Sequence, residues 1–414
     1  MVEFGAAVDT CNSPPGVLVR RGFPVYLWGF SAIDAYLGRF PAGETLALTG
    51  ADTADLARVF EELRYPGIDL ADAAVDWEEG VCYFRCAELS GGSAGGGAFF
   101  TNAGIFPSGD GRRPSFGFLE FYMDCRTGHF IDPKGNYFLL RQCLKEAQPD
   151  LRTDNINPGI ERCRALMDWA LILARYFPLD ETRLRGADLF SELAEGPAPG
   201  IEEQRLLLTG ILTSRNPGAG LEFLKDNGFI HDYWPELAVL DDVDHSKEFH
   251  PEGNVWRHTL ETFRYRKASG GGIYDLRLSL GLLLHDIGKP MAETTGSRRF
   301  DGHAEIGERQ ARRFLERLEF PAALISDVCY LVRNHMFPAA LPRLPLIRTE
   351  ERMSSPLFPV LMELYRCDES SSFKGLDAYY ESSAAYQAYL RHRRNPYRTA
   401  DGKKLGNNRK PYVR

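Results

Sequence analysis

The chain has 414 residues, of which 44% are apolar and 26% charged, with a net charge of −8. Such a composition is typical of a globular protein of two to four modules, whose core needs no disulfide or metal to hold it together. The acidic balance argues against a uniformly basic nucleic-acid-binding protein, although it allows a local basic patch. Residues 1–17 lack a signal-peptide pattern, and the longest apolar runs, such as 280–284, are far too short to cross a bilayer. We therefore expect a cytoplasmic protein with no membrane partner.

The first 150 residues have the pattern of a small α/β unit. Short apolar runs at 24–30, 45–49 and 81–86 favour strands, and the spacing of apolar residues at 31–38 and 52–64 favours helices. Segments 116–124 and 129–132 are typical of a hairpin whose turn lies at 126–128. The stretches rich in glycine, serine and proline at 90–97 and 108–114 indicate loops.

From about residue 154 the pattern changes to helical spacing and continues almost to residue 390. Breaks are expected at 197–200, 215–218, 269–272 and 337–345, where proline and glycine gather. The eight cysteines are scattered, and Cys82 with Cys86 has no matching second pair, so free buried thiols are expected rather than a zinc ribbon. The fold class predicted is α+β, a small α/β head followed by an all-α body.

The C-terminal segment 391–414 is strongly basic, with nine Lys or Arg residues against one acid, Asp401. Two interpretations stay open with equal weight. The segment is either a solvated tail or a patch that binds nucleic acid.

Five segments of the helical region carry histidine or aspartate in a pattern that suits a metal. An adjacent pair, His285 and Asp286, follows the apolar run 280–284 and begins the string His-Asp-Ile-Gly-Lys that ends at Lys289. The other segments contribute one residue each: His258, His303, His335 and Asp368. Any one of these residues alone is more often structural, and only their combination indicates a site.

A mixed site of histidine and carboxylate suits a divalent ion such as Mn, Mg, Ni, Co, Fe or Zn. His258, His285, Asp286 and Asp368 are the predicted metal ligands, with His303 and His335 as additional candidates. Two histidines and two aspartates would leave positions on the ion for water and for a phosphate oxygen. His285, Asp286 and Lys289 are the predicted catalytic residues, and Lys289 could meet a substrate phosphate.

These residues resemble the HD domain of bacterial tRNA nucleotidyltransferases, the CCA-adding enzymes and poly(A) polymerases. The likeness rests on the string from His250 to His258, on His285-Asp286-Ile-Gly-Lys289 and on His303. In the wider HD phosphohydrolase superfamily, the pattern His…His-Asp…Asp holds the metal, and His303 and His335 match histidines that hold a second metal or contact phosphate in some members. Upstream, segments 227–236, 26–38 and 124–133 resemble parts of the same family, so the likeness covers about residues 24–390.

The head departs from the family pattern where the transfer chemistry should be. Where the family has Gly-Gly and Arg in its phosphate-binding turn and helix, this chain has Gly29-Phe30 and Ile33, and only Asp34 is kept. Glu44-Thr-Leu46 stands where the family has Asp-x-Asp. The Glu-Asp-x-x-Arg motif falls near 157–161 without its side chains, the segment from Arg112 loses its Asp and Asn, and Arg85 is a further remnant. We interpret Gly29, Asp34, Glu44 and Arg85 as a weak nucleotide- or RNA-binding remnant of a degenerate head.

The resulting division has four parts: a degenerate nucleotidyltransferase-like head at 1–153, a helical neck at 154–245, an HD domain at 246–390 and the basic tail at 391–414. The first hypothesis is a metal-dependent phosphohydrolase that acts on nucleotides or RNA ends. The alternatives are an active tRNA nucleotidyltransferase or poly(A) polymerase, and a non-catalytic RNA-binding protein. A nucleotide or RNA, tRNA above all, is the expected partner, and the sequence does not indicate an oligomeric state.

Overall fold

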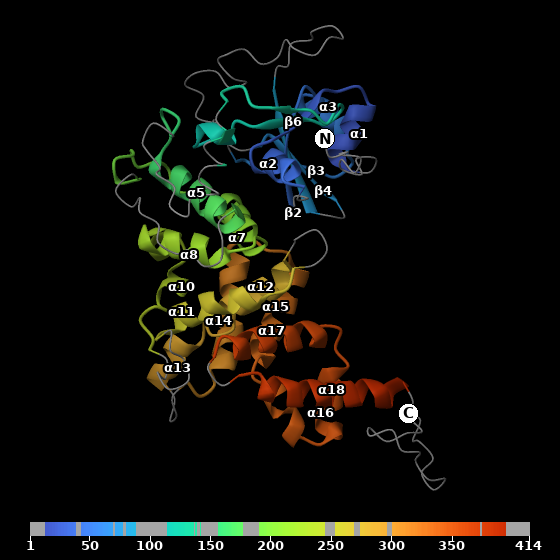
Figure 1. The fold of residues 1–414 in the computed structure, drawn as a ribbon, viewed down its shortest axis with the longest axis vertical. Helices are drawn as coiled ribbons and strands as arrows, with labels where there is room; N and C mark the ends of the chain where they lie inside the picture. The colour runs from blue at the N-terminus through green and yellow to red at the C-terminus, as the bar shows by residue number, and fades with distance from the viewer. Residues whose placement is uncertain are drawn as a thin grey trace. The chain divides into compact units, whose positions relative to one another are not determined.

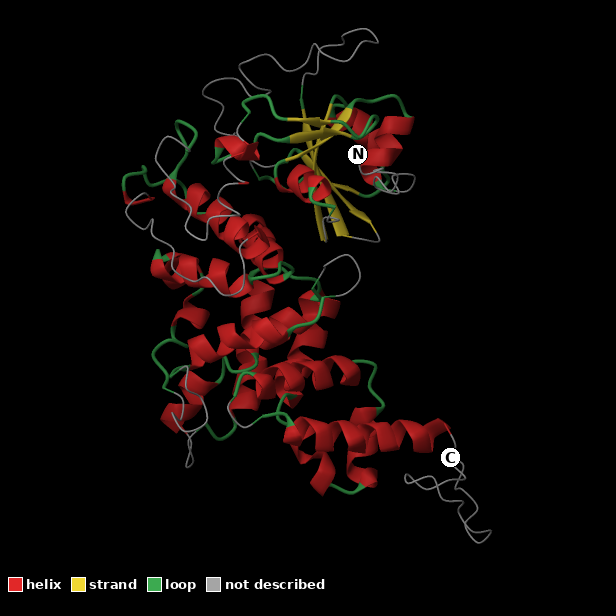
Figure 2. Ribbon diagram, viewed as in Figure 1, coloured by secondary structure: helices red, strands yellow, loops and turns green. Residues whose placement is uncertain are grey.

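The computed structural model of the chain describes residues 13–38, 43–68, 71–77, 80–87, 114–135, 137–138, 141, 156–176, 190–244, 253–268, 274–295, 300–372 and 375–394. The chain forms two compact units. We call residues 1–229 with 268–274 the sheet unit, and residues 230–267 with 275–414 the helical unit. In Figure 2 the strands all lie in the sheet unit. A mixed α/β sheet followed by a helical body confirms the predicted α+β class.

The sheet unit is organised around a seven-stranded sheet of order β3-β4-β5-β2-β1-β6-β7. β2 and β5 are parallel over the register Gly43↔Gly80 to Thr49↔Cys86, and the other neighbours are antiparallel. The strands are β1 (Val25–Trp28), β2 (Gly43–Thr49), β3 (Leu63–Arg64), β4 (Ala73–Trp77), β5 (Gly80–Cys86), β6 (Tyr122–Asp124) and β7 (Phe130–Ile131). All four residues of β1 are buried, as expected for a central strand.

Helices accompany this sheet and follow it in the chain (Figure 1). They are α1 (Pro14–Arg20), α2 (Phe30–Tyr36), α3 (Thr53–Val59), the short η1 (Gly117–Leu119), α5 (Arg162–Tyr176), α7 (Ile201–Leu212) and α8 (Pro217–Asp226). The turn between β1 and α2 needs Gly29, whose φ of 58° is a left-handed conformation that other residues rarely adopt. The predicted strands at 24–30, 45–49 and 81–86, the helix at 31–38 and the hairpin turn at 126–128 are confirmed.

Two local predictions in the head are wrong. The helix expected over 52–64 ends at Val59, because Phe60 turns to stack on Phe84 and Arg64 pairs with Asp76 across the β3–β4 ladder. The strand expected from residue 116 begins only at Tyr122. Phe116 instead packs against Trp169 of α5, and tertiary contacts of this kind override local strand propensity. The loop expected at 90–97 and all but the last residue, Pro114, of the loop expected at 108–114 lie outside the described residues.

The helical unit is built from helices throughout its described part. They are α9 (Phe229–Tyr233, from the unit boundary), α10 (Pro235–Ala238), α11 (Val255–Thr262), η3 (Phe263–Tyr265), α12 (Leu276–Leu284), α13 (Lys289–Thr295), α14 (His303–Arg317), α15 (Ala322–Asn334), η5 (Pro338–Arg343), α16 (Leu346–Met353), α17 (Phe358–Ser370) and α18 (Asp377–Arg394). The predicted break at 197–200 directly precedes α7, and the break at 337–345 contains η5. The break expected at 215–218 overlaps the start of α8, which begins at Pro217. The break at 269–272 and the tail beyond residue 394 are outside the described residues.

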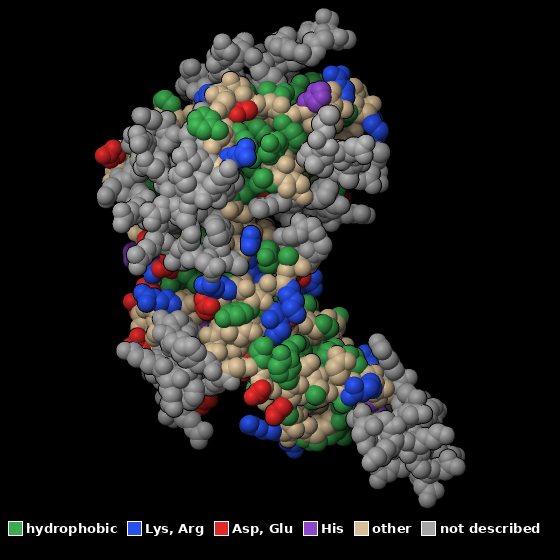
Figure 3. Space-filling model, in the orientation of Figure 1, with side chains coloured by type: hydrophobic (Ala, Val, Ile, Leu, Met, Phe, Trp, Pro, Cys, Tyr) green, Lys and Arg blue, Asp and Glu red, His purple; other side chains and the backbone are tan. Residues whose placement is uncertain are grey.

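None of the described helices combines the length and the apolar character that a membrane span requires. On the face in Figure 3, the described acidic and basic side chains are interspersed with apolar ones. This mixture agrees with the expectation that the chain is not uniformly basic.

A buried ion pair fastens α5 to α2 within the sheet unit. Arg175 Nη1 donates to Asp34 Oδ2 at 2.6 Å, and the Tyr176 hydroxyl donates to Asp34 Oδ1 at 3.0 Å. The side chains of Asp34 and Arg175 are only 9% and 13% exposed, respectively. Removing one partner of such a pair leaves an uncompensated buried charge.

We therefore predict that Asp34→Ala lowers the free energy of unfolding by about 3–5 kcal/mol, measured by urea denaturation. The double variant Asp34→Ala with Arg175→Met should recover much of that loss because it leaves no buried charge behind. A single variant as stable as the wild type would contradict this account of the ion pair.

Candidate metal centre

The predicted metal ligands come from five helices of the helical unit. His258 lies inside α11, His303 is the first residue of α14, and Asp368 lies near the end of α17. His285 and His335 each sit at the C-terminal end of a helix, α12 and α15. The ends of four helices and the middle of α11 therefore bring together residues that are up to more than 100 positions apart in the sequence.

A close backbone approach is needed to assemble these helix ends. A Cβ added at Gly288 would lie 2.1 Å from the carbonyl oxygen of His303 and 2.5 Å from the Gly307 nitrogen. Neither backbone atom can give way cheaply, so the glycine of the His-Asp-Ile-Gly-Lys string lets the chain after Asp286 pack directly on α14.

The described metal-binding candidates form two groups of three. The first group is His258, His285 and Asp368, and the second is Asp286, His303 and His335. In each group, the candidate ligand atoms lie within 4.8 Å of one another. All six predicted ligands are therefore brought together.

Asp286 joins the two groups, because each of its carboxylate oxygens faces one of them. Oδ2 lies 3.2 Å from His285 Nε2 and 3.9 Å from His258 Nε2. Oδ1 lies 3.7 Å from His303 Nε2 and 3.9 Å from His335 Nε2. The carboxylate, buried at 2% exposure, is thus enclosed by four imidazole rings.

Backbone carbonyls fix the orientation of three of these rings. The Nδ1 atoms of His285, His303 and His335 each lie 2.8 Å from a carbonyl oxygen three residues earlier in the chain. A carbonyl only accepts a hydrogen bond, so Nδ1 carries the proton and Nε2 presents a lone pair toward Asp286. The fourth ring, His258, has its Nδ1 3.3 Å from the hydroxyl of Ser371, which itself donates to the Asp368 carbonyl.

The facing nitrogen atoms of His303 and His335 form a place that suits a positive charge. His303 Nε2 and His335 Nε2 are 3.0 Å apart, a distance at which two lone pairs repel each other. Burial and the neighbouring His285 lower the pKa of His335 to about 4, and burial lowers the pKa of His303 as well. A shared proton is therefore disfavoured at neutral pH, whereas a metal cation fits the same place.

The first group, His258, His285 and Asp368, is also suited to a cation. His258 Nε2 lies 3.0 Å from Asp368 Oδ1. Burial alone would raise the pKa of Asp368, but the hydrogen bond with His258 and the electrostatic influence of His285 and His258 lower it below its usual range. The buried Nε2 atom of His285 has no hydrogen-bond partner among the described residues. A carboxylate that stays ionised beside an orphaned imidazole nitrogen is a suitable donor set for a divalent ion.

Lys289 is held beside this centre and is nearly buried. Its ammonium donates to Asp286 Oδ2 at 2.6 Å and lies 5.3 Å from the ring centroid of Phe300. The predicted catalytic residues His285, Asp286 and Lys289 are therefore neighbours.

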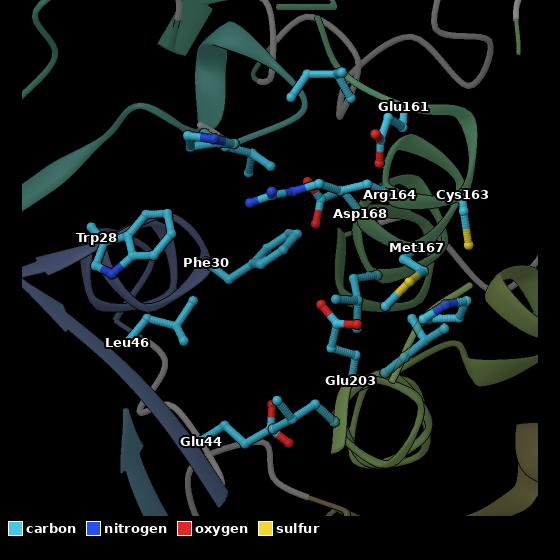
Figure 4. Close-up of a pocket in the computed structure, with 18 of the residues that line it drawn as sticks. Trp28, Phe30, Glu44, Leu46, Glu161, Cys163, Arg164, Met167, Asp168 and Glu203 are labelled. Atoms are coloured by element: carbon cyan, nitrogen blue, oxygen red, sulfur yellow. The ribbon is translucent and has the colours of Figure 1, made fainter. Parts of the chain in front are cut away.

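The sheet unit contains a separate cavity of about 290 Å³ (Figure 4). Trp28, Phe30 and Leu46 form its apolar side, and Arg164 and Asp168 extend into it from α5. Of the remnant residues predicted in the head, Gly29 and Glu44 line this cavity. Asp34 instead binds Arg175, and Arg85 is buried in β5.

The family that the head resembles has two carboxylates, in the motif Asp-x-Asp, at the positions of Glu44 and Leu46 in this chain. Glu44 and Leu46 are two residues apart on β2 and both line the cavity, so the side chain beside Glu44 is apolar. Burial raises the pKa of Glu44 to about 8, although Arg175 and Arg205 oppose this shift. Among the described residues, no set of three or more candidate metal ligands forms around Glu44.

Sequence reasoning missed Arg164 and Asp168 of the cavity, and Ser371 and Phe300 of the metal centre. The spacing of Arg164 and Asp168 on one face of a helix was a usable signal. Ser371 and Phe300 act through a hydroxyl, a carbonyl and a ring that no motif marks.

Known proteins resemble the chain in the following ways. The HD domain family matches residues 255–363. A CC-adding tRNA nucleotidyltransferase of Thermus thermophilus is 33% identical over 147 residues, which are 33% of this chain and 32% of that protein. A multifunctional CCA protein of Xanthomonas campestris is 27% identical over 336 residues, 77% of each chain.

Coverage of these relatives differs. The chain spans about a third of the length of the Thermus protein and of a multifunctional CCA protein of Halorhodospira halophila, at 32% and 29%. Among solved structures, the Bacillus stearothermophilus CCA-adding enzyme in complex with CTP has a TM-score of 0.43 at 16% identity, covering 95% of this chain and 84% of that one.

The raised pKa of Glu44 predicts how stability depends on pH. The folded chain holds a proton on Glu44 up to about pH 8, whereas the unfolded chain releases it near the usual pKa of 4.5. The wild type should therefore lose stability relative to Glu44→Gln as the pH rises from about 4.5 to 8, on the order of a few kcal/mol in all. Urea denaturation at several pH values measures the difference, and a difference independent of pH would contradict the burial of this carboxyl group.

Proposed function

We propose that this chain, which carries an HD domain and is homologous to CCA-adding tRNA nucleotidyltransferases, is a metal-dependent phosphohydrolase or phosphodiesterase. Its substrates are nucleotides or RNA ends, and its scaffold derives from a nucleotidyltransferase whose transfer site has been lost. The observation that supports the proposal most strongly is the set of four imidazole nitrogens that face the buried carboxylate of Asp286.

The residues have distinct roles in this proposal. His258, His285, Asp286 and Asp368 would hold a divalent ion, and His303 and His335 would hold a second one together with Asp286. A divalent ion in such a site polarises a phosphoryl oxygen and makes water a better nucleophile at neutral pH.

The protein's own groups prepare that chemistry. The carbonyl oxygens that accept from Nδ1 keep each Nε2 atom available as a ligand. Lys289, paired with Asp286, supplies a positive charge that can compensate the phosphate of the substrate. Burial excludes most water from the centre, which strengthens each of these electrostatic interactions.

Hydrolysis of a panel of phosphoesters tests the proposal. The panel includes 2′,3′-cyclic nucleotides and bis-p-nitrophenyl phosphate, each assayed with Mn, Mg, Ni or Co. His285→Ala and Asp286→Ala should each reduce kcat/KM about 100-fold or more, because a lost ligand costs at least as much as a lost partner of a ligand. The matched control is His231→Ala, whose side chain is 84% exposed on α9 and should leave turnover unchanged.

Undiminished turnover in the His285→Ala and Asp286→Ala variants would contradict the assignment. Loss of activity in the His231→Ala control would show that replacing a histidine outside the centre also inactivates the protein. The losses in the other two variants would then not support the assignment.

Nucleotidyl transfer is the second candidate, and the homology to CCA-adding enzymes favours it. The proposal instead predicts no incorporation of labelled ATP or CTP into tRNA that lacks its 3′ end, with Mg present, because one carboxylate on β2 does not hold two Mg ions as transfer requires. Incorporation above background that Glu44→Gln abolishes would restore the transferase, with tRNA as the partner.

A further inference from the structure

Phe300 adopts an unusual backbone conformation next to the metal centre. Its φ is 62°, and it is one of two described residues other than glycine with a positive φ, the other being Glu319. A bulky side chain in this left-handed region is strained, and such strain persists only where the surroundings enforce it. Residues held in this way gather at functional sites, so the contacts of Phe300 call for an explanation.

The carbonyl group of Phe300 is directed at His303. It accepts from the His303 backbone N–H at 3.2 Å and from His303 Nδ1 at 2.8 Å. These two bonds close the turn before α14 and fix the ring, so that Nε2 faces Asp286 Oδ1 at 3.7 Å. A return of Phe300 to a negative φ would move the peptide that follows and take the carbonyl group away from the ring.

The aromatic ring of Phe300 has a second contact on the same carboxylate. The Lys289 ammonium lies 5.3 Å from the ring centroid, within the range of a cation–π interaction. The same ammonium donates to Asp286 Oδ2 at 2.6 Å. Phe300 therefore contacts the two neighbours that face the two carboxylate oxygens of Asp286: His303 at Oδ1 and Lys289 at Oδ2.

We propose that Phe300 is a positioning residue of the centre. Its left-handed backbone orients His303 as a ligand, and its ring holds Lys289 beside Asp286. The inference rests on the proposed function, since both neighbours belong to that site. It adds a residue that carries no metal-binding or acid–base group of its own.

Three substitutions separate the backbone role from the ring role. Phe300→Gly removes the ring but adopts a positive φ without strain, so the carbonyl stays in place. Phe300→Val removes the ring and resists a positive φ because its side chain is β-branched. Phe300→Tyr keeps both features and is the conservative control.

Two readouts are measured on the full chain, with thermal unfolding to verify folding. The first is Mn affinity by equilibrium dialysis without substrate. Phe300→Val should weaken Mn binding about 10-fold or more, as loss of a ligand's hydrogen-bond partner does, while Phe300→Gly and Phe300→Tyr should bind as the wild type does. The second is KM for bis-p-nitrophenyl phosphate, which should rise about 2- to 5-fold in Phe300→Gly through loss of the cation–π contact and stay unchanged in Phe300→Tyr.

The outcomes distinguish this inference from the proposed function. Wild-type Mn affinity in a folded Phe300→Val variant, or equal weakening in Phe300→Gly, would overturn the backbone role. An unchanged KM in Phe300→Gly would overturn the ring role. Absence of binding to the wild type of Mn and, in the same dialysis, of Mg, Ni and Co would overturn the proposed function and this inference together. Metal binding without any phosphoester hydrolysis would overturn the hydrolase alone.

Discussion

The buried carboxylate of Asp286 is the constraint on which the helical unit depends. A charged carboxylate at 2% exposure is costly unless ligands or donors compensate it on every side. Here Lys289 compensates the carboxylate directly, and the four imidazole nitrogens that face it from α11, α12, α14 and α15 form with it a donor set for a cation. The packing of these helix ends, including the contact that Gly288 permits, surrounds this one pair of oxygen atoms.

The same constraint explains why the clustering of the candidate ligands was largely predictable from sequence. His285 and Asp286 are adjacent, and their string is rare enough to indicate a site even before the other histidines are considered. The residues that orient the rings were not predictable, because three of the acceptors are backbone carbonyl groups. The left-handed φ of Phe300 and the hydroxyl of Ser371 likewise depend on the folded backbone.

In the head, the central strands were predictable from the sequence, whereas β4 and the contact made by Asp34 were not. Apolar runs predicted β1, β2 and β5, since buried central strands have a strong local signal. β4 begins with two alanines and gives no such signal, and its place is set by pairing with β5. Asp34, interpreted as a binding remnant, forms a buried ion pair with Arg175, so a residue that matches a motif can also contribute to stability.

The two sites differ in what their residues can support. The sheet-unit cavity offers Glu44 beside the apolar Leu46, and the pKa of Glu44 is raised to about 8. The centre around Asp286 offers two groups of three ligand candidates with oriented nitrogens. A reaction that depends on divalent ions is therefore better supported in the helical unit.

Anomalous diffraction from crystals grown with Mn tests this conclusion most directly. The account predicts Mn peaks on either side of the Asp286 carboxylate, within reach of the Nε2 atoms of His258, His285, His303 and His335, and no peak at Glu44. A Mn peak at Glu44 with none at Asp286 would contradict it.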